Sequence, residues 1–172
     1  MIFKRFFLLI SLAVLIPIAK NVNAKNITVT INGEIFASPC IVDNNQTIDV
    51  KFGPVSISEL MSEKTQVQKS VSLDCQSYSG SPYVKITGTS LSSSLPHVLR
   101  TNTNNLGIAL FQGKGTNYPM RIGSGTNKNG FLIQNGLMGN TFTFTAMPYS
   151  KDTTTLYGGD FNASATMSII YI

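Results

Sequence analysis

The chain has 172 residues, of which 42% are hydrophobic and 12% are charged, with a formal net charge of +5. That length suits one domain with a real core behind a short leader. Three of the 13 basic residues, Lys4, Arg5 and Lys20, lie near the start, so the rest of the chain carries 10 basic against 8 acidic residues. Without a cluster of Lys or Arg, binding to nucleic acid or to an anionic membrane is not indicated.

Residues 1–24 have the pattern of a secretory signal peptide. Lys4 and Arg5 form a basic start, an apolar run extends from Phe6 to Ala19, and small residues near Ala24 supply a cleavage site. We expect cleavage after Ala24, which leaves residues 25–172; an uncleaved membrane anchor is the alternative. The apolar run is shorter than a comfortable bilayer span, and no other segment approaches 18 apolar residues.

The segment after the leader alternates between apolar and polar residues. One face would carry Ile27, Val29, Ile31, Gly33 and Ile35. Successive side chains of a strand point to opposite faces, so this period predicts a strand. Because the segment precedes the first cysteine, we interpret it as an arm outside the domain. An ordinary first strand of the same domain is the alternative.

Cys40 and Cys75 are the cysteines of the chain, 35 positions apart. An even count in a secreted protein argues for one disulfide. Closing a loop of that size stabilises a fold by about 4 kcal/mol in the chain-entropy model. A metal site is disfavoured, since there is no Cys-x-x-Cys motif and His97 is the only histidine.

The middle of the chain predicts short strands separated by turns, and no convincing helix. The expected strands are 67–75, 83–89, 106–111 and 141–147, and the last of these alternates strictly and is rich in Thr and Phe. Gly-, Asn- and Ser-rich stretches at 90–94, 113–117 and 123–130 indicate loops, and 58–64 could form a short helical turn. Many short strands with frequent turns predict an all-β sandwich.

The C-terminal segment predicts a long strand with one buried side. Its apolar face consists of Phe161, Ala163, Ala165, Met167, Ile169 and Tyr171, and polar residues occupy most of the other face. A strand-like arm at one end of a small secreted β-protein and an apolar strand at the other suggest polymerisation by exchange of strands between subunits.

Signals for catalysis are weak. His97 follows Pro96 in a polar stretch, where we expect a solvated loop histidine rather than part of a triad. The run Gly113-Lys114-Gly115 lacks the spacing of a phosphate-binding loop, so we interpret it as a hairpin turn. Carboxylates are few, with Asp152 and Asp160 in separate turns. We therefore expect no enzyme, cofactor or metal.

Five features at fixed spacings give the chain a specific resemblance. Gly33 is the fourth apolar-face position of the arm, Cys40 follows seven residues later, and Cys75 ends a strand. Gly159 stands fourteenth from the C-terminus, and Tyr171 is penultimate. Over the whole mature chain this pattern resembles the subunits of chaperone–usher pili. Within that family the chain is most similar to the minor tip adaptor pilins of P pili, and the arm also resembles the adaptors of type 1 pili.

The resemblance implies an incomplete immunoglobulin-like sandwich that lacks its seventh strand. Residues 25–36 would be an N-terminal extension that serves as donor strand, through Ile27, Val29, Ile31, Gly33 and Ile35, and residues 37–172 would be the pilin domain. The missing strand would leave a groove beside the C-terminal strand that accepts a chaperone or another subunit's arm. Its residues would be Gly159, Phe161, Ala163, Ala165, Met167, Ile169, Tyr171 and Ile172.

The resemblance also implies a function and a set of partners. The chain would be a minor structural subunit, the adaptor that joins the tip adhesin to the tip fibrillum by donor-strand exchange. Its partners would be a periplasmic chaperone, an outer-membrane usher, the adhesin and the adjacent fibrillum subunit, and it would travel through the periplasm to the pilus tip. The alternatives are a repeating major pilin or, in another class, a secreted carbohydrate-binding sandwich.

Overall fold

The computed structural model describes residues 26–34, 38–123 and 130–172. The chain divides into two compact units, residues 1–34 and 35–172, and each is described by itself. The described strands lie in the second unit: β1 Ile41–Val42, β2 Val67–Asp74, β3 Pro82–Thr87, β4 Ser90–Ser92, β5 Leu95–Arg100, β6 Leu106–Gln112, β7 Phe131–Leu132, β8 Leu137–Met138, β9 Thr141–Ser150 and β10 Thr166–Tyr171. Short 3₁₀ turns complete it: η1 Asp43–Asn45, η2 Ile57–Glu59, η3 Glu63–Thr65 and η4 Thr153–Thr155.

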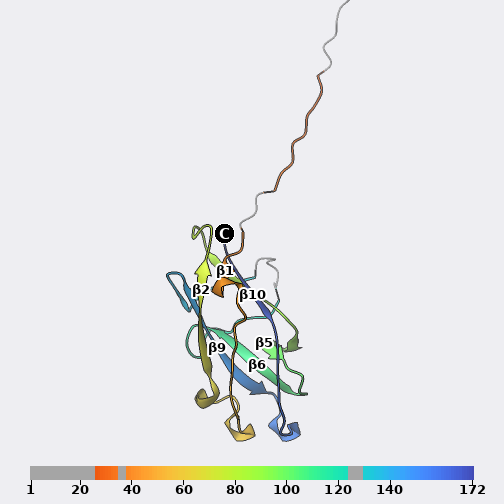
Figure 1. The fold of residues 1–172 in the computed structure, drawn as a ribbon. Helices are drawn as coiled ribbons and strands as arrows, with labels where there is room; N and C mark the ends of the chain where they lie inside the picture. Colours follow the sequence, from red (N-terminus) through yellow and green to blue (C-terminus); the bar gives the residue numbers. More distant parts are fainter. Residues whose placement is uncertain (1–25, 35–37, 124–129) are drawn as a thin grey trace, which may run out of the picture. The chain divides into compact units, whose positions relative to one another are not determined.

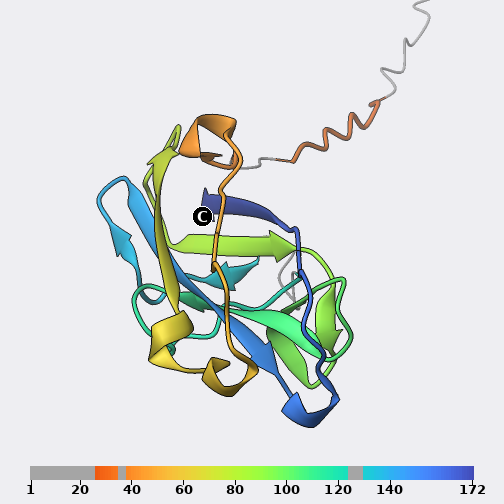
Figure 2. The ribbon, with the colours of Figure 1, turned by 60° about the horizontal axis from the view of Figure 1, so that its bottom comes forward.

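The strands form two antiparallel sheets. The larger has the order β1-β2-β9-β6-β5-β4, with β8 paired to β9, and the smaller has the order β10-β3-β7. The larger sheet runs through the body of the domain in Figure 1, and Figure 2 shows the C-terminal strand β10 beside β3. The all-β sandwich predicted from the sequence is confirmed. Among the described residues, no helix is long and apolar enough to cross a bilayer.

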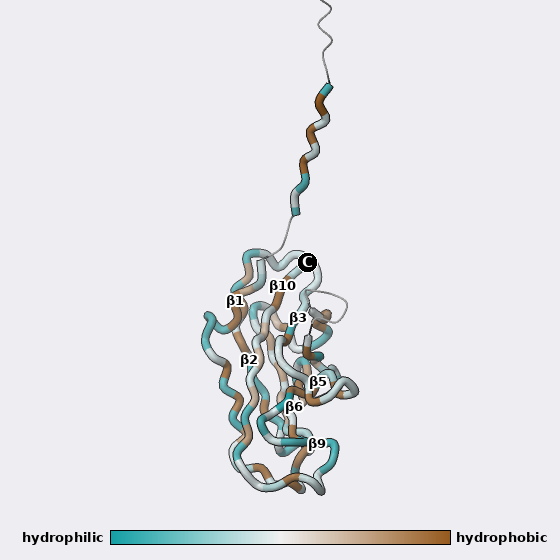
Figure 3. Tube along the Cα trace, turned by 90° about the vertical axis from the view of Figure 1, so that its right-hand side faces the viewer, coloured by the Kyte–Doolittle hydropathy of each residue, from teal (hydrophilic) through white to brown (hydrophobic). Residues whose placement is uncertain are grey.

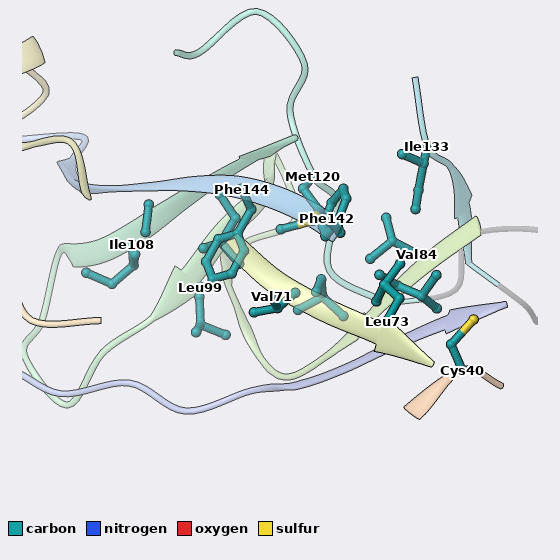
Figure 4. Packing of buried hydrophobic residues seen from close by; sticks show 14 of the residues in the cluster. Cys40, Val71, Leu73, Val84, Leu99, Ile108, Met120, Ile133, Phe142 and Phe144 are labelled. Carbon is teal, nitrogen blue, oxygen red and sulfur yellow. The ribbon is translucent and has the colours of Figure 1, made fainter. Parts of the chain in front are cut away.

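The main core lies between the two sheets. On β2, Val71 and Leu73 are buried while Ser70 and Ser72 are exposed, as the alternation of the strand predicts. Phe142 of β9 and Ile169 of β10 are both fully buried in the same cluster, so the core reaches from one sheet to the other. Figure 4 shows side chains of this cluster, with Leu99, Ile108 and Phe144 gathered at one end of the core.

The central strand β6 is buried along its whole length. Its Ile108 and Leu110 belong to the main core, whereas Ala109 and Phe111 belong to a second cluster with Val98 and Met147. Because alternate residues of a strand face opposite sides, β6 contributes to an apolar cluster on each face of the larger sheet. That explains the nearly continuous apolar run from Leu106 to Phe111.

One local prediction was wrong, one strand was missed and one turn was approximate. The Ser-rich stretch at 90–94, predicted as a loop, contains β4, which pairs with β5, a strand that was not predicted from the sequence. The serines on β4 are tolerated because it is an edge strand, where polar residues are common. The turn expected at 58–64 is split into η2 and η3.

The C-terminal strand is shorter than predicted. β10 begins at Thr166, where it pairs with Thr87, and continues to Tyr171 opposite Pro82. Residues 161–165 keep the alternation of the sequence, but they carry no strand assignment. A strand needs a neighbour to pair with, and this part of the segment borders a groove instead.

The arm carries no strand within residues 26–34. Ile27, Val29 and Ile31 are 83%, 76% and 88% exposed, and Figure 3 shows the alternation of apolar and polar residues along the segment. The signal peptide, Ile35 and most of the predicted loop at 123–130 lie outside the described residues. The predicted boundaries at 24 and 36 therefore stay predictions.

Candidate functional site

A groove of about 1440 Å³ runs along one side of the domain. Two extended segments, residues 46–55 and 159–168, line its sides. Its floor comes from both sheets and is apolar: Ile86, Leu99, Ile108, Leu110, Met120, Phe144 and Ala146. The groove therefore opens directly onto the core of the sandwich.

The first wall of the groove, residues 46–55, alternates as a strand does but has no partner strand in the described chain. Ile48, Val50 and Phe52 are half-buried against the core, and the residues between them are exposed. In the part of the chain that the structure describes, residues 47–55 form no backbone hydrogen bond with another segment. This wall was not predicted from the sequence, although the alternation of Ile48, Val50 and Phe52 was a signal that could have found it.

The second wall contains five of the predicted groove residues, Gly159, Phe161, Ala163, Ala165 and Met167. Ala163 and Ala165 are exposed, and Phe161 and Met167 are half-buried. Asn162, between two of them, is bonded to Asn102 of the β5–β6 loop: its carbonyl accepts from the Asn102 amide at 3.1 Å, and its amide donates to the Asn102 Oδ1 at 2.8 Å.

The two walls are linked by a ring contact and carry few charges. The rings of Phe52 and Phe161 meet with their centroids 6.0 Å apart, which links the walls. The charged side chains among the lining residues are Asp49, Lys51 and Asp160, all exposed. An apolar floor with a thin, mixed-charge rim suits a segment with alternating apolar side chains better than a charged ligand.

The sequence predicted Ile169 on the exposed face of the groove, but its side chain is fully buried. Ile169 has a neighbouring segment, which residues 161–165 lack along the groove. The Cys40 amide donates to the Ile169 carbonyl at 2.7 Å, so the segment before β1 covers this part of β10. Cys40 also forms the predicted disulfide with Cys75 at the end of β2. Cys40 therefore closes this end of the groove, next to Ile169.

Tyr171 and Ile172 also lie outside the groove lining, in a clamp at the end of the chain. Ile172 exchanges two backbone hydrogen bonds with Ser81, at 2.7 and 3.0 Å. The Tyr171 ring packs edge-on against Tyr78, with centroids 5.4 Å apart. Burial, and secondarily the neighbouring Tyr78, raise the pKa of the Tyr171 hydroxyl. Binding of a chaperone at these residues stays a prediction.

The candidate catalytic features form no cluster within the described residues. His97 was predicted as a solvated loop residue, but it is half-buried on β5, with its ring 5.7 Å from that of Phe111. Burial, and secondarily the positive charge of Arg121, lower the pKa of His97. The predicted hairpin turn at Gly113-Lys114-Gly115 is confirmed, because the Gln112 amide donates to the Tyr118 carbonyl across it at 2.7 Å.

Comparison with known proteins gives a consistent family. The sequence model of the family described as "Fimbrial protein" matches residues 29–172. Two curated proteins of Escherichia coli, the minor fimbrial protein PrsF and the fimbrial adapter PapF, are each 37% identical over 148 residues. Those matches cover 85% of this chain and 88% of each relative.

Solved structures agree with that result. The P pilus adaptor subunit PapF is similar with a TM-score of 0.57 and 34% identity, covering 81% of this chain and 100% of that one. The P pilus rod subunit PapA matches with a TM-score of 0.55 at 22% identity over 84% of this chain and 100% of its own. A chaperone–usher pilus structure matches with a TM-score of 0.53 at 20% identity, over 90% and 100%. The last two show the fold alone.

Proposed function

The chain belongs to the fimbrial protein family, and on that premise we propose that it joins a tip adhesin to the tip fibrillum of a chaperone–usher pilus by donor-strand exchange. It is a fimbrial subunit of the cell surface. The 37% identical relatives are described as a minor fimbrial protein and a fimbrial adapter, and the rod subunit is less similar, at 22% identity. This ranking favours a minor adaptor over a repeating major subunit.

The observation that carries the proposal is a groove with the form of one absent strand. Both walls are extended, both have apolar side chains at every second position, and neither is paired along the groove within the described chain. Unpaired strand edges recruit strands from other chains. Donor-strand complementation of pilins is itself an established instance of this recognition mode, in which main-chain bonds give affinity and side-chain pockets give specificity. A strand inserted here would complete the sandwich.

The arm has the matching chemistry for the groove of another subunit. Ile27, Val29 and Ile31 are exposed in this structure, and each would contribute about 1.5–3 kcal/mol when fully buried in an acceptor. Gly33 continues the same face with no side chain, which would let two backbones approach closely at that position. One chain thus presents both a donor and an acceptor, as a link between two neighbours requires.

The proposed function involves two further partners, a chaperone and an usher, and it requires no chemical reaction. In the periplasm, the groove would be filled by a strand of a chaperone, and an outer-membrane usher would receive the complex. Replacement of the chaperone strand by a subunit's arm is an exchange of one strand for another, driven by the difference between two complements. No covalent bond is made or broken, so the function requires neither catalytic residues nor a cofactor.

The arm is tested by one charge placed on each of its faces. Ile31→Asp would bury an unpaired carboxylate in the acceptor, whereas Thr30→Asp places the same charge on the solvent face of the neighbouring residue. We expect Ile31→Asp to abolish copurification with the adhesin and Thr30→Asp to preserve it, with chaperone binding unchanged in both. Pairing of Ile31→Asp with the adhesin at the wild-type level would show that the arm is not the donor.

The groove is tested against the carbohydrate-binding alternative by purification alone. A complete sandwich that binds sugars is stable as a monomer without help. An incomplete sandwich needs a chaperone or an added strand, and a donor strand fused through a flexible linker should raise its melting temperature. A stable monomer that does not respond to the added strand would refute the proposed function.

A further inference from the structure

The second wall of the groove is attached to the body of the domain at Asn162. Its N–H and C=O are both engaged by Asn102, one by the side-chain Oδ1 at 2.8 Å and the other by the backbone amide at 3.1 Å. Asn102 thereby satisfies Asn162 as a neighbouring strand would. In the described chain, no other backbone hydrogen bond reaches residues 160–165.

The direction of the two hydrogen bonds at Asn162 determines where the N–H and C=O groups of the adjacent residues point. In an extended segment, the N–H and C=O of one residue point to the same side, and those of the next residue point to the opposite side. Ile172 turns its polar groups to Ser81 next to β3, whereas the Ile169 carbonyl faces Cys40 on the other side. Asn162 is an even number of positions from Ile172, so its N–H and C=O point to the same side of the segment as those of Ile172. That side faces away from the groove.

We infer that Asn102 is a positioning residue for strand exchange: by holding Asn162, it turns the backbone N–H and C=O groups of Phe161, Ala163 and Ala165 toward the groove. This inference rests on the proposed function and adds a residue that lines no part of the groove. The donor would find the correct set of hydrogen-bonding groups already facing it. A wall rotated by one residue would instead present Asn162 and Ser164, and every side chain would face the wrong way.

The geometry beside Asn162 supports this role. β10 leaves its pairing with β3 at Thr166, so the ladder no longer holds the wall beyond that residue. Gly88, just after β3, allows the wall to pass closely: a Cβ there would lie 2.8 Å from Leu99 Cδ1 and 3.2 Å from Ala165 Cβ. Going from Thr166 toward Phe161, the wall first passes Gly88 at Ala165. The next point at which it is held is Asn162, through Asn102.

Three single variants test the inference in the full mature chain. Asn102→Ala removes the Oδ1 acceptor, Asn102→Asp keeps an acceptor of the same shape, and Asn104→Ala removes an exposed amide of the same loop that makes no hydrogen bond in the described structure. The probe is a synthetic peptide with the sequence of residues 26–36, and its capture is measured as the subunit refolds. Loss of one exposed hydrogen bond should slow capture about fivefold.

We expect Asn102→Ala to slow capture and to speed hydrogen exchange at the Asn162 amide, Asn102→Asp to restore both, and Asn104→Ala to change neither. Wild-type capture rates in Asn102→Ala, or equal slowing in Asn104→Ala, would overturn the inference. Exchange in the wild-type chain needs no variant: the Asn162 amide must be protected relative to those of Phe161 and Ala163, and equal rates would also overturn it. A wild-type chain that captures no strand of any kind counts against the proposed function, whereas the exchange rates still judge Asn102.

Discussion

The C-terminal segment has one sequence pattern and two structural outcomes. From Thr166 to Tyr171 it is a strand, paired with β3 on one side and covered by Cys40 at Ile169 on the other. From Phe161 to Ala165 the same alternation continues, but the segment is unpaired along the groove and held at Asn162. We call these the paired half and the open half.

The difference between the halves shows that an apolar alternation specifies a face, while the neighbours decide whether a strand forms. Ile169 is fully buried in the paired half because the segment before β1 lies against it, and Ala163 is exposed in the open half because no described segment covers it. The open half has the pattern of a strand and lacks the partner. Three changes to the chain test the two halves, and a fourth tests a site outside them.

The largest effect is expected from the disulfide beside the paired half. Replacing Cys40 and Cys75 by serine removes a cross-link between residues 35 positions apart, which should lower the free energy of unfolding by about 4 kcal/mol. Urea denaturation of the strand-complemented protein measures the loss. Reduction of the wild-type protein is the control, and it should reproduce most of the effect. Two free thiols in assembled wild-type material would contradict the bond itself.

A charge in the open half should act on strand capture. Phe161→Asp places a carboxylate on the inner side of the wall, where an inserted strand would bury it, so donor binding should weaken by about 100-fold or more. Asn162→Asp puts the same charge on the adjacent, exposed side chain and should bind nearly normally. Titration with a fluorescent donor peptide compares them, and equal losses would show that the wall does not have the orientation described here.

A smaller effect should follow from crowding the end of the paired half. Gly80 has φ +94°, and a Cβ there would lie 2.5 Å from the Ile172 carbonyl oxygen, so Gly80→Ala should destabilise by about 2–3 kcal/mol. Gly115→Ala has a similar φ of +77° with open space around it, and it should cost about 1 kcal/mol from the backbone alone. Thermal denaturation of both variants isolates the clash, and an equal loss would mean that the clamp contributes nothing.

Acid should produce the smallest effect, and it should not distinguish the halves. His97 lies on β5, and its pKa in the folded state is lowered from 6.5 by burial and by Arg121. The unfolded chain therefore takes up this proton first, and the stability contributed by neutral His97 is lost as the pH falls below 6.5. His97→Gln should remove that part of the pH dependence between about pH 7 and 5 in urea denaturation. An unchanged pH profile would show that His97 is not its source.

The sequence predicted the paired features well because they repeat locally. The alternation around Val71, the continuous run at Leu110 and the strict period at Phe142 each identified a strand without knowledge of its partner. The first wall was missed although Ile48, Val50 and Phe52 alternate with polar residues, and Pro96 hid the strand that carries His97.

The open half of the site lay beyond sequence reasoning for a different reason. The pattern at Phe161 is the same whether or not a neighbour is present, so it predicted a strand that the isolated chain does not complete. Asn102 and Asn162 are 60 positions apart, and neither residue has a local pattern that points to the other. Long-range contacts of this kind follow from the packing of loops, which periodicity does not report.

The bond between Cys40 and Ile169 has a mechanical consequence for a fibre linked in the proposed way. Tension arriving through the arm would enter the domain at Cys40, which is tied to β2 by the disulfide and to β10 by its amide. It would leave through the strand held along Phe161–Met167, on the same edge of the same segment. The load would then run lengthwise along that segment, where several hydrogen bonds share it at once.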